Sequence, residues 1–206
     1  MTQEHQAGTG RRGAPYAYSD NPGPNGGYRL GQAFRSTRRA LALALDKPTE
    51  DDKTSQRGIA VEALRDGQSK LAQIAAVQQL RVLEQPLIAL HANPLKDRLR
   101  DWTWELVLPI LGQAKADAEA GVTLTRIYGG AYVETLTTGG FDDLDNLYSY
   151  LIGTYLPHHK HQLTRPVILH RVMDGLAGDG RTPLTLAVYV PIVLSLQRPT
   201  QPDEQA

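Results

Sequence analysis

Apolar residues recur at the spacing of an amphipathic helix along much of this chain, and that spacing constrains the fold more than any other feature. Between residues 95 and 110, apolar side chains fall at positions i, i+4, i+7, i+11 and i+15, which places them on one face of a helix. The segments 28–46, 56–83, 141–155 and 164–176 show similar periodicity, and proline, aspartate or glycine residues begin or end them. We therefore predict about five helices.

The apolar residues of the four clearest predicted helix faces are Leu30, Phe34, Leu41 and Leu45, then Ala60, Val61, Leu64, Leu71, Ala75 and Val82, then Leu95, Leu99, Trp102, Leu106 and Ile110, and finally Phe141, Leu144, Leu147, Tyr148, Leu151, Ile152 and Tyr155.

A small β element is expected in the second half of the chain. Two β-prone runs, 122–128 and 131–136, flank Gly129 and Gly130, which is typical of a hairpin around a tight turn. The segment 182–196 is apolar on all sides and rich in β-branched residues, which favours a buried strand over a helix. The predicted fold class is mainly α (α+β), a helical bundle with a small β hairpin and a C-terminal strand; a short helical piece is also expected over 87–91.

The 206 residues are expected to form one domain between two flexible ends. Residues 1–27 are rich in glycine and proline and poor in large aliphatic side chains, so they predict a disordered N-terminal arm. Residues 197–206 predict a flexible C-terminal tail, which leaves 28–196 as a single helix-rich domain. We find no internal sequence repeat at a fixed period.

Composition excludes several classes of protein. The chain has no cysteine, which rules out a disulfide framework, a thiolate metal site and a cysteine nucleophile. Its 22 basic and 22 acidic residues cancel, which argues against a polybasic nucleic-acid coat. The longest apolar run, 183–196, is too short to span a bilayer, which needs about 20 residues. We expect a cytoplasmic protein without a membrane partner and without a cofactor.

Arginines form the densest basic cluster. Arg35, Arg38 and Arg39 fall at i, i+3 and i+4 of a predicted helix, Arg29 precedes them, and no acidic residue interrupts the stretch 28–45. Such a face can bind a phosphate backbone or an acidic partner, although solvated surface arginines are the commoner explanation. The predicted arm adds two further candidates for nucleic-acid binding, Arg11 and Arg12.

Two other groups of residues are candidate sites. Trp104 lies off the apolar stripe of its predicted helix, so an exposed Trp104 would be an interface residue, whereas packing beneath a neighbouring element is the alternative. His158, His159 and His161 crowd one loop and could hold a metal if another ligand folded back onto them. A small metal-dependent hydrolase would use these histidines or His170, together with the carboxylates Asp142, Asp143 or Asp174.

The segment Tyr28-Arg-Leu-Gly-Gln-Ala-Phe34 resembles a helix in the helical C-terminal region of the large subunits of CRISPR interference complexes. The resemblance covers these residues alone and carries no catalytic signature, so we do not assign the chain to that family. It adds an RNA-guided defence complex to the assemblies in which such a chain could serve.

No strong catalytic motif or cofactor loop occurs in the sequence. The functional prediction is a non-enzymatic helical subunit or adaptor of a multi-subunit assembly, which binds a protein partner or itself and contacts nucleic acid through the basic helix. The alternatives are the metal-dependent hydrolase and a purely structural component of a phage-like or secretion-like particle.

Overall fold

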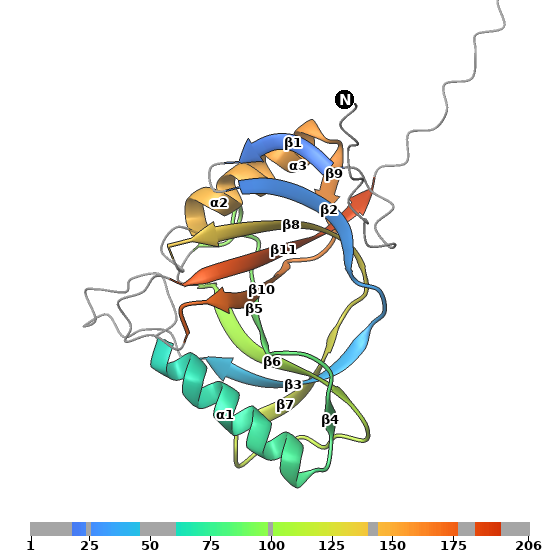
Figure 1. The fold of residues 1–206 in the computed structure, drawn as a ribbon, viewed down its shortest axis with the longest axis vertical. Helices are drawn as coiled ribbons and strands as arrows, with labels where there is room; N and C mark the ends of the chain where they lie inside the picture. The colour runs from blue at the N-terminus through green and yellow to red at the C-terminus, as the bar shows by residue number, and fades with distance from the viewer. Residues whose placement is uncertain are drawn as a thin grey trace, which may run out of the picture.

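The computed structural model describes residues 18–23, 26–45, 61–98, 101–139, 144–176 and 184–194. Within these ranges the dominant element is an 11-stranded antiparallel sheet, which curves around the middle of the molecule (Figure 1). The fold is therefore β-rich, and the predicted helical bundle is wrong.

The strands are β1 (Tyr18–Gly23), β2 (Gly26–Phe34), β3 (Arg38–Leu45), β4 (Arg81–Val82), β5 (Leu87–His91), β6 (Thr103–Leu111), β7 (Val122–Ile127), β8 (Gly130–Thr138), β9 (His161–Leu163), β10 (Val167–Asp174) and β11 (Thr185–Leu194). The helices are α1 (Val61–Val77), α2 (Leu144–Tyr150), the π-helical turn η2 (Leu151–Tyr155) and α3 (Leu156–His158).

The middle of the sheet consists of two units with the same topology. The strand order β8-β11-β10-β5-β6-β3 contains the unit β3-α1-β5-β6 on one side and the unit β8-α2-β10-β11 on the other. In each unit the first strand lies outermost, the last strand lies in the middle, and the remaining strand lies at the seam where β5 pairs with β10. The chain thus repeats a topology without a repeat in its sequence.

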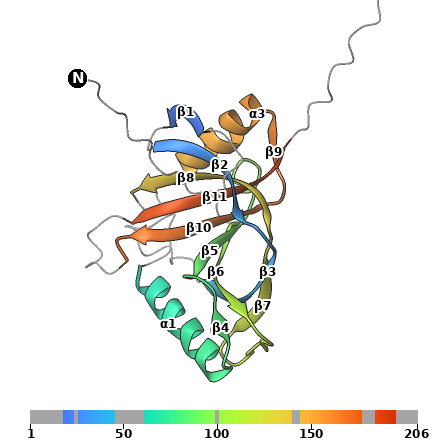
Figure 2. The ribbon, with the colours of Figure 1, turned by 45° about the vertical axis from the view of Figure 1, so that its right-hand side comes forward.

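Two long bent strand pairs join the ends of this sheet. β2 pairs with β8 and β3 pairs with β7, so the paths β2–β3 and β7–β8 run side by side in both ribbon views (Figures 1 and 2). At the bend, the Gly129 amide donates to the Thr37 hydroxyl at 3.2 Å. The strands predicted over 122–128 and 131–136 are confirmed, but they do not pair with each other, so the predicted hairpin is wrong.

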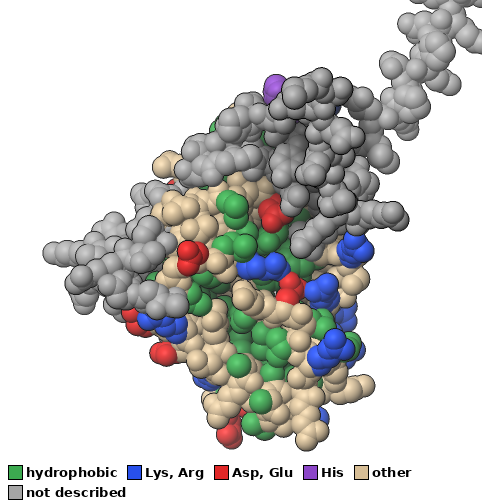
Figure 3. Space-filling view, viewed as in Figure 1, with side chains coloured by type: hydrophobic (Ala, Val, Ile, Leu, Met, Phe, Trp, Pro, Cys, Tyr) green, Lys and Arg blue, Asp and Glu red, His purple; other side chains and the backbone are tan. Residues whose placement is uncertain are grey.

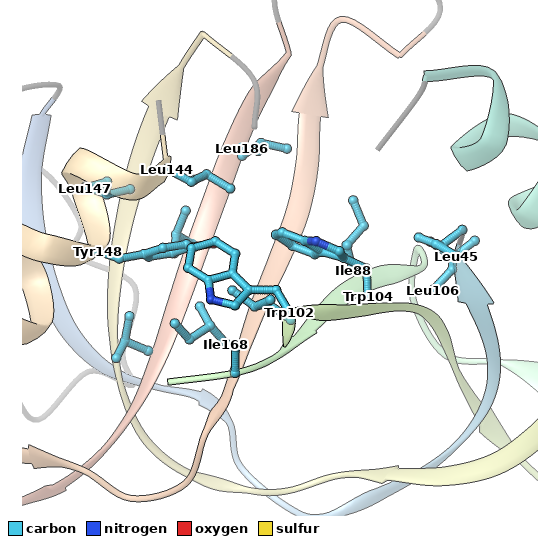
Figure 4. Close-up of a cluster of buried hydrophobic side chains, with 14 of the residues drawn as sticks. Leu45, Ile88, Trp102, Trp104, Leu106, Leu144, Leu147, Tyr148, Ile168 and Leu186 are labelled. Atoms are coloured by element: carbon cyan, nitrogen blue, oxygen red, sulfur yellow. The ribbon is translucent and has the colours of Figure 1, made fainter. Parts of the chain in front are cut away.

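The two faces of the sheet carry separate apolar clusters. On β3, Leu41 and Leu45 belong to the cluster beneath the helices, whereas Ala40 and Ala42 belong to the cluster on the opposite face. This alternation follows from the two-residue period of a strand. Figure 4 shows the helix-side cluster, in which Trp102 contacts Tyr148 of α2 and Trp104.

Several predicted helices are strands because their apolar spacing fits both structures. Leu41 and Leu45, like Leu106 and Ile110, are four residues apart, and a separation of four returns to the same face of a strand as well as of a helix. The residues two positions away distinguish a strand from a helix. Trp104 and Leu108 belong to the same cluster as Leu106, which is the two-residue period of a strand. Strands therefore take the place of four predicted helices: β2 and β3 in 28–46, β5 in 87–91, β6 in 95–110 and β10 in 164–176.

Other elements agree with the sequence. α1 lies within the predicted helix 56–83, and α2 with η2 occupies most of 141–155. The strand predicted within 182–196 is β11. β1 lies inside the segment expected to be a disordered arm, and the predicted tail 197–206 lies outside the described residues.

Candidate ligand-binding cleft

A cleft opens on the face of the sheet opposite the helices. Its volume is about 90 Å³. Five of its lining residues belong to the apolar cluster of that face, so its walls are largely hydrophobic. The cleft is lined by Ala89, His91, Glu105, Val107, Thr125, Arg126, Ile127, Tyr128, Tyr132, Arg165, Val167 and Leu169.

Strand alternation explains why polar groups reach this otherwise apolar place. On β5, Ala89 and His91 lie on the cleft face while Leu90 faces the helices. On β6, Glu105 and Val107 also lie on the cleft face. Because β5 and β6 are neighbours with Ala89 opposite Glu105, the small side chain at position 89 leaves space beside the carboxylate.

Glu105 carries a negative charge that His91 offsets. The His91 Nε2 atom lies 2.8 Å from Oε2 of Glu105 and donates a hydrogen bond to it. This hydrogen bond holds the pKa of Glu105 below its usual value, although burial acts in the opposite direction. Both side chains are about one-third exposed, 36% and 29%, so the pair remains accessible from the cleft.

Arg165 and two tyrosines also line the cleft. The guanidinium carbon of Arg165 lies 4.2 Å from the centre of the Tyr128 ring, which is cation–π geometry. The Tyr132 hydroxyl donates to the Tyr128 carbonyl at 2.7 Å, and this bond fixes the segment that carries the Tyr128 ring. Burial raises the pKa of Tyr132, with Arg165 acting against the shift, so Tyr132 is a neutral donor.

A second polar network lies on the same face outside the cleft. Glu84 accepts hydrogen bonds from Arg38, at 2.6 Å, and from Arg171. Arg171 also lies 5.7 Å from the Tyr189 ring centre. Burial raises the pKa of Tyr189 to about 12. These half-buried charges have partners within the protein, so they hold strands together and leave Glu105, His91 and Arg165 as the polar groups of the cleft.

The arginines predicted to share a helix face are separated in the structure. Arg35 is exposed in the bend between β2 and β3, Arg38 is paired with Glu84, and Arg39 is exposed on β3. Arg29 lies on β2 with its side chain outside the described part, and Arg11 and Arg12 lie in undescribed segments. No helix carries these residues, because 38–45 is a strand and its neighbouring positions face opposite sides. The resemblance of 28–34 to a helix fails for the same reason.

Arg39 has a neighbour that the sequence pattern did not indicate. It lies directly opposite Arg126 in the β3–β7 ladder. Both side chains are exposed and line a hollow of about 380 Å³ with Ala114, Leu124 and Thr125. On the face drawn in Figure 3, Asp and Glu side chains lie among the Lys and Arg side chains.

The other predicted sites are not assembled as sites. Trp104 is 6% exposed, and its ring centre lies 6.4 Å from that of Trp102. The predicted interface role depended on an exposed Trp104, whereas the side chain is buried. The His158 and His159 rings meet edge to face, and His159 stacks on His161. Among the described residues, no group of three His, Asp or Glu side chains could hold a metal ion.

The residues of the hydrolase alternative do not converge either. His170 and Asp174 lie on the strand β10 and not on a helix. The His170 ring is completely buried and bonded to Tyr148 and to the Ile88 carbonyl. Asp142 and Asp143 lie outside the described residues.

Sequence reasoning missed the cleft altogether. A signal was available in the segment 103–111, where Glu105 is a single acidic residue at an alternating position of an otherwise apolar run. Once 103–111 is recognised as a strand, that carboxylate lies on the face opposite Trp104 and Leu106 and requires a polar partner there.

Comparison with known proteins shows what the fold resembles. The chain aligns with the EcmrR C-terminal domain at a TM-score of 0.59 and 12% identity, over 86% of this chain and 99% of that domain. It also aligns with EcmrR in an EcmrR–DNA complex at a TM-score of 0.57 and 12% identity, over 80% of this chain. That alignment spans 57% of the EcmrR chain. At this identity the similarity shows a shared fold.

No family model matches the sequence, and no curated protein matches it. In the described part of the chain, none of the helices has the length and apolarity needed to cross a membrane.

Proposed function

We propose that this chain is a binding module for a small organic ligand, which enters the cleft around Glu105. The observation that carries the proposal is an ionised carboxylate and its His91 donor held, partly exposed, in an otherwise apolar and aromatic hollow. Such a combination of apolar walls and a few converging polar groups is typical of small-molecule sites. The fold shared with the EcmrR C-terminal domain is compatible with a compact module of this size.

Filling the cleft tests the proposal. Ala89 is 2% exposed and lies on its floor, so Ala89→Leu, or the milder Ala89→Val, occupies space that a ligand needs. Ligand-induced thermal shifts across a panel of small aromatic compounds should identify binders of the unmodified protein, and both variants should lose them. Ala72→Leu, at an exposed position of α1, is the matched control and should retain binding.

Two results would contradict the binding module. The first is a panel in which no compound raises the melting temperature. The second is binding that survives Ala89→Leu in a variant whose own unfolding transition remains cooperative.

A second candidate function is contact with a nucleic-acid backbone through Arg39 and Arg126. These arginines lie opposite each other, although like charges in this arrangement repel, and a phosphate would relieve that repulsion. EcmrR is found in a DNA complex, which makes DNA a sensible probe. Association with a protein partner or a second copy stays a prediction from the sequence.

The test is the fluorescence anisotropy of labelled single-stranded and duplex DNA at low and high salt. The double variant Arg39→Gln, Arg126→Gln should weaken binding and reduce its salt dependence. Lys70→Gln removes an exposed cation from α1 and should change neither. Equal binding by the double variant would refute this candidate.

A further inference from the structure

The charges around the cleft indicate which class of ligand it accepts, an inference that rests on the proposed binding function. Three chargeable side chains of the lining belong to the cleft itself: His91, Glu105 and Arg165. Arg126 also borders the cleft, but it lies opposite Arg39 in the β3–β7 ladder and lines the separate hollow with it. Glu105 is the single acidic residue among the described residues of the lining. The balance between these groups decides whether an anionic, neutral or cationic ligand is favoured.

The carboxylate of Glu105 already has a hydrogen-bond partner within the protein. Glu105 accepts the hydrogen bond from His91 at 2.8 Å, and the pKa of its carboxyl group is lowered accordingly. A cationic ligand would have to compete with His91 for this carboxylate, at the cost of desolvating its own charge. Glu105 is therefore a weak attraction for a cation.

Arg165, in contrast, retains donors that no described residue uses. It is half-buried beside the cleft, and its one described side-chain contact is with the ring of Tyr128. Among the described residues, no carboxylate forms an ion pair with it. Stacking on an aromatic ring leaves the N–H groups at the rim of the guanidinium plane available, and that planar fork matches a carboxylate.

The size of the cleft limits the rest of the ligand. Its volume of about 90 Å³ is smaller than a cavity of roughly 150 Å³ that can hold one benzene ring. The apolar part of the cleft therefore has room for no more than one ring, and a substituent on that ring would lie outside the apolar part. Val107, Val167 and Leu169 supply the walls, and Tyr128 and Tyr132 supply aromatic contacts.

We infer that the cleft binds a single-ring aromatic carboxylate, with the ring between the apolar walls and the carboxylate paired with Arg165. Glu105 and His91, which also line the cleft, then accommodate a ring substituent that hydrogen-bonds. The carboxylate of Glu105 also disfavours a second anionic group there.

Three nearly isosteric probes separate the charge classes: benzoate is anionic, benzamide is neutral and benzamidine is cationic. Titration calorimetry and ligand-observed NMR on the full chain should give the order benzoate, then benzamide, then benzamidine, with about tenfold tighter binding of benzoate than of benzamide. Arg165→Gln should remove most of that difference while leaving benzamide within about threefold, and Arg165→Lys should restore part of it. Arg35→Gln, at an exposed position outside the cleft, should change nothing.

The outcomes distinguish this inference from the function on which it rests. If benzamidine or benzamide binds more tightly than benzoate, and Ala89→Leu abolishes that binding, the binding module stands and the anionic class is wrong. Benzoate affinity that is unchanged in a folded Arg165→Gln variant also overturns the class. If none of the three probes and no compound of the wider panel binds, both the class and the binding function fail.

Discussion

The hydroxyl group of Tyr148 on α2 lies 2.5 Å from Nε2 of His170 on β10, and both side chains are completely buried. Nδ1 of the same imidazole lies 3.1 Å from the Ile88 carbonyl of β5. The tyrosine therefore donates to Nε2 while Nδ1–H donates to the carbonyl, a pattern that requires neutral histidine. One imidazole thus connects the second helix to the seam between the two halves of the sheet.

This arrangement predicts a loss of stability in acid. Burial lowers the pKa of His170 from 6.5 to about 4. Between these values the unfolded chain binds a proton that the folded protein does not, so the free energy of unfolding falls as the pH drops from about 6.5 to 4. The expected contribution of His170 is about 3 kcal/mol over that interval. Urea denaturation at several pH values measures it.

His170→Gln is the control for this pH dependence, because glutamine can accept and donate hydrogen bonds without titrating. The variant should be less stable at pH 7 and should show a shallower loss of stability towards pH 4. An NMR titration in which His170 protonates near pH 6.5 in the folded protein would contradict the prediction directly.

Tyr148→Phe tests the hydrogen bond itself. The change keeps the ring, which packs against Trp102, but leaves the buried Nε2 of His170 without a donor. An unsatisfied buried polar atom costs about 1–3 kcal/mol, so the free energy of unfolding should fall by that amount. Tyr128→Phe, at a ring 47% exposed, should change it by less than about 0.5 kcal/mol. Equal effects of the two changes would show that the bond contributes no net stability.

The elements that sequence analysis predicted correctly are those in which only one periodicity fits. In α1, Leu64, Leu71 and Ala75 are buried, and the separation of seven between Leu64 and Leu71 matches two helical turns but not one face of a strand. In α2 and η2, Leu147, Tyr148 and Leu151 are all buried, and adjacent buried residues followed by i+4 also indicate a helix. In β11, a continuous apolar run rich in β-branched residues predicted the strand.

The elements that sequence analysis predicted wrongly depend on contacts between residues far apart in the chain. The alternation of leucine and alanine in 41–45 becomes informative only when both faces of β3 are known to be covered, one by α1 and one by the opposite cluster. The sequence indicates a polar position at Glu105, but the cleft around it could not be predicted, because His91 belongs to the neighbouring strand β5 and Arg165 to a bend far along the chain. Pairing of that kind is set by sheet topology and not by local spacing.

β6 offers a direct check of the strand assignment. Leu106 is completely buried, whereas Leu111, five positions along the same strand, is 57% exposed. Leu106→Ala should lower the free energy of unfolding by about 2–5 kcal/mol, because it leaves a cavity beneath α1. Leu111→Ala should cost less than about 1 kcal/mol. Chemical denaturation of both variants measures this contrast, and a larger loss at Leu111 would contradict the register of β6.

Substitution by alanine should have opposite effects on stability at two glycines, Gly129 in the bend between β7 and β8 and Gly153 in η2. A Cβ atom at Gly129 would lie 2.8 Å from the Ser36 backbone on the neighbouring bent strand, closer than a real contact, so Gly129→Ala must push the two strands apart. At Gly153 in η2 the nearest atom to a Cβ would be a Leu95 methyl group at 3.6 Å, an ordinary contact, and alanine is favoured over glycine inside helices by about 0.5–1 kcal/mol. Thermal unfolding should therefore show a lower melting temperature for Gly129→Ala and an unchanged or higher one for Gly153→Ala. If Gly129→Ala is as stable as the unmodified protein, the strands β2–β3 and β7–β8 are not in contact at their bends, and the closure of the sheet described here is incorrect.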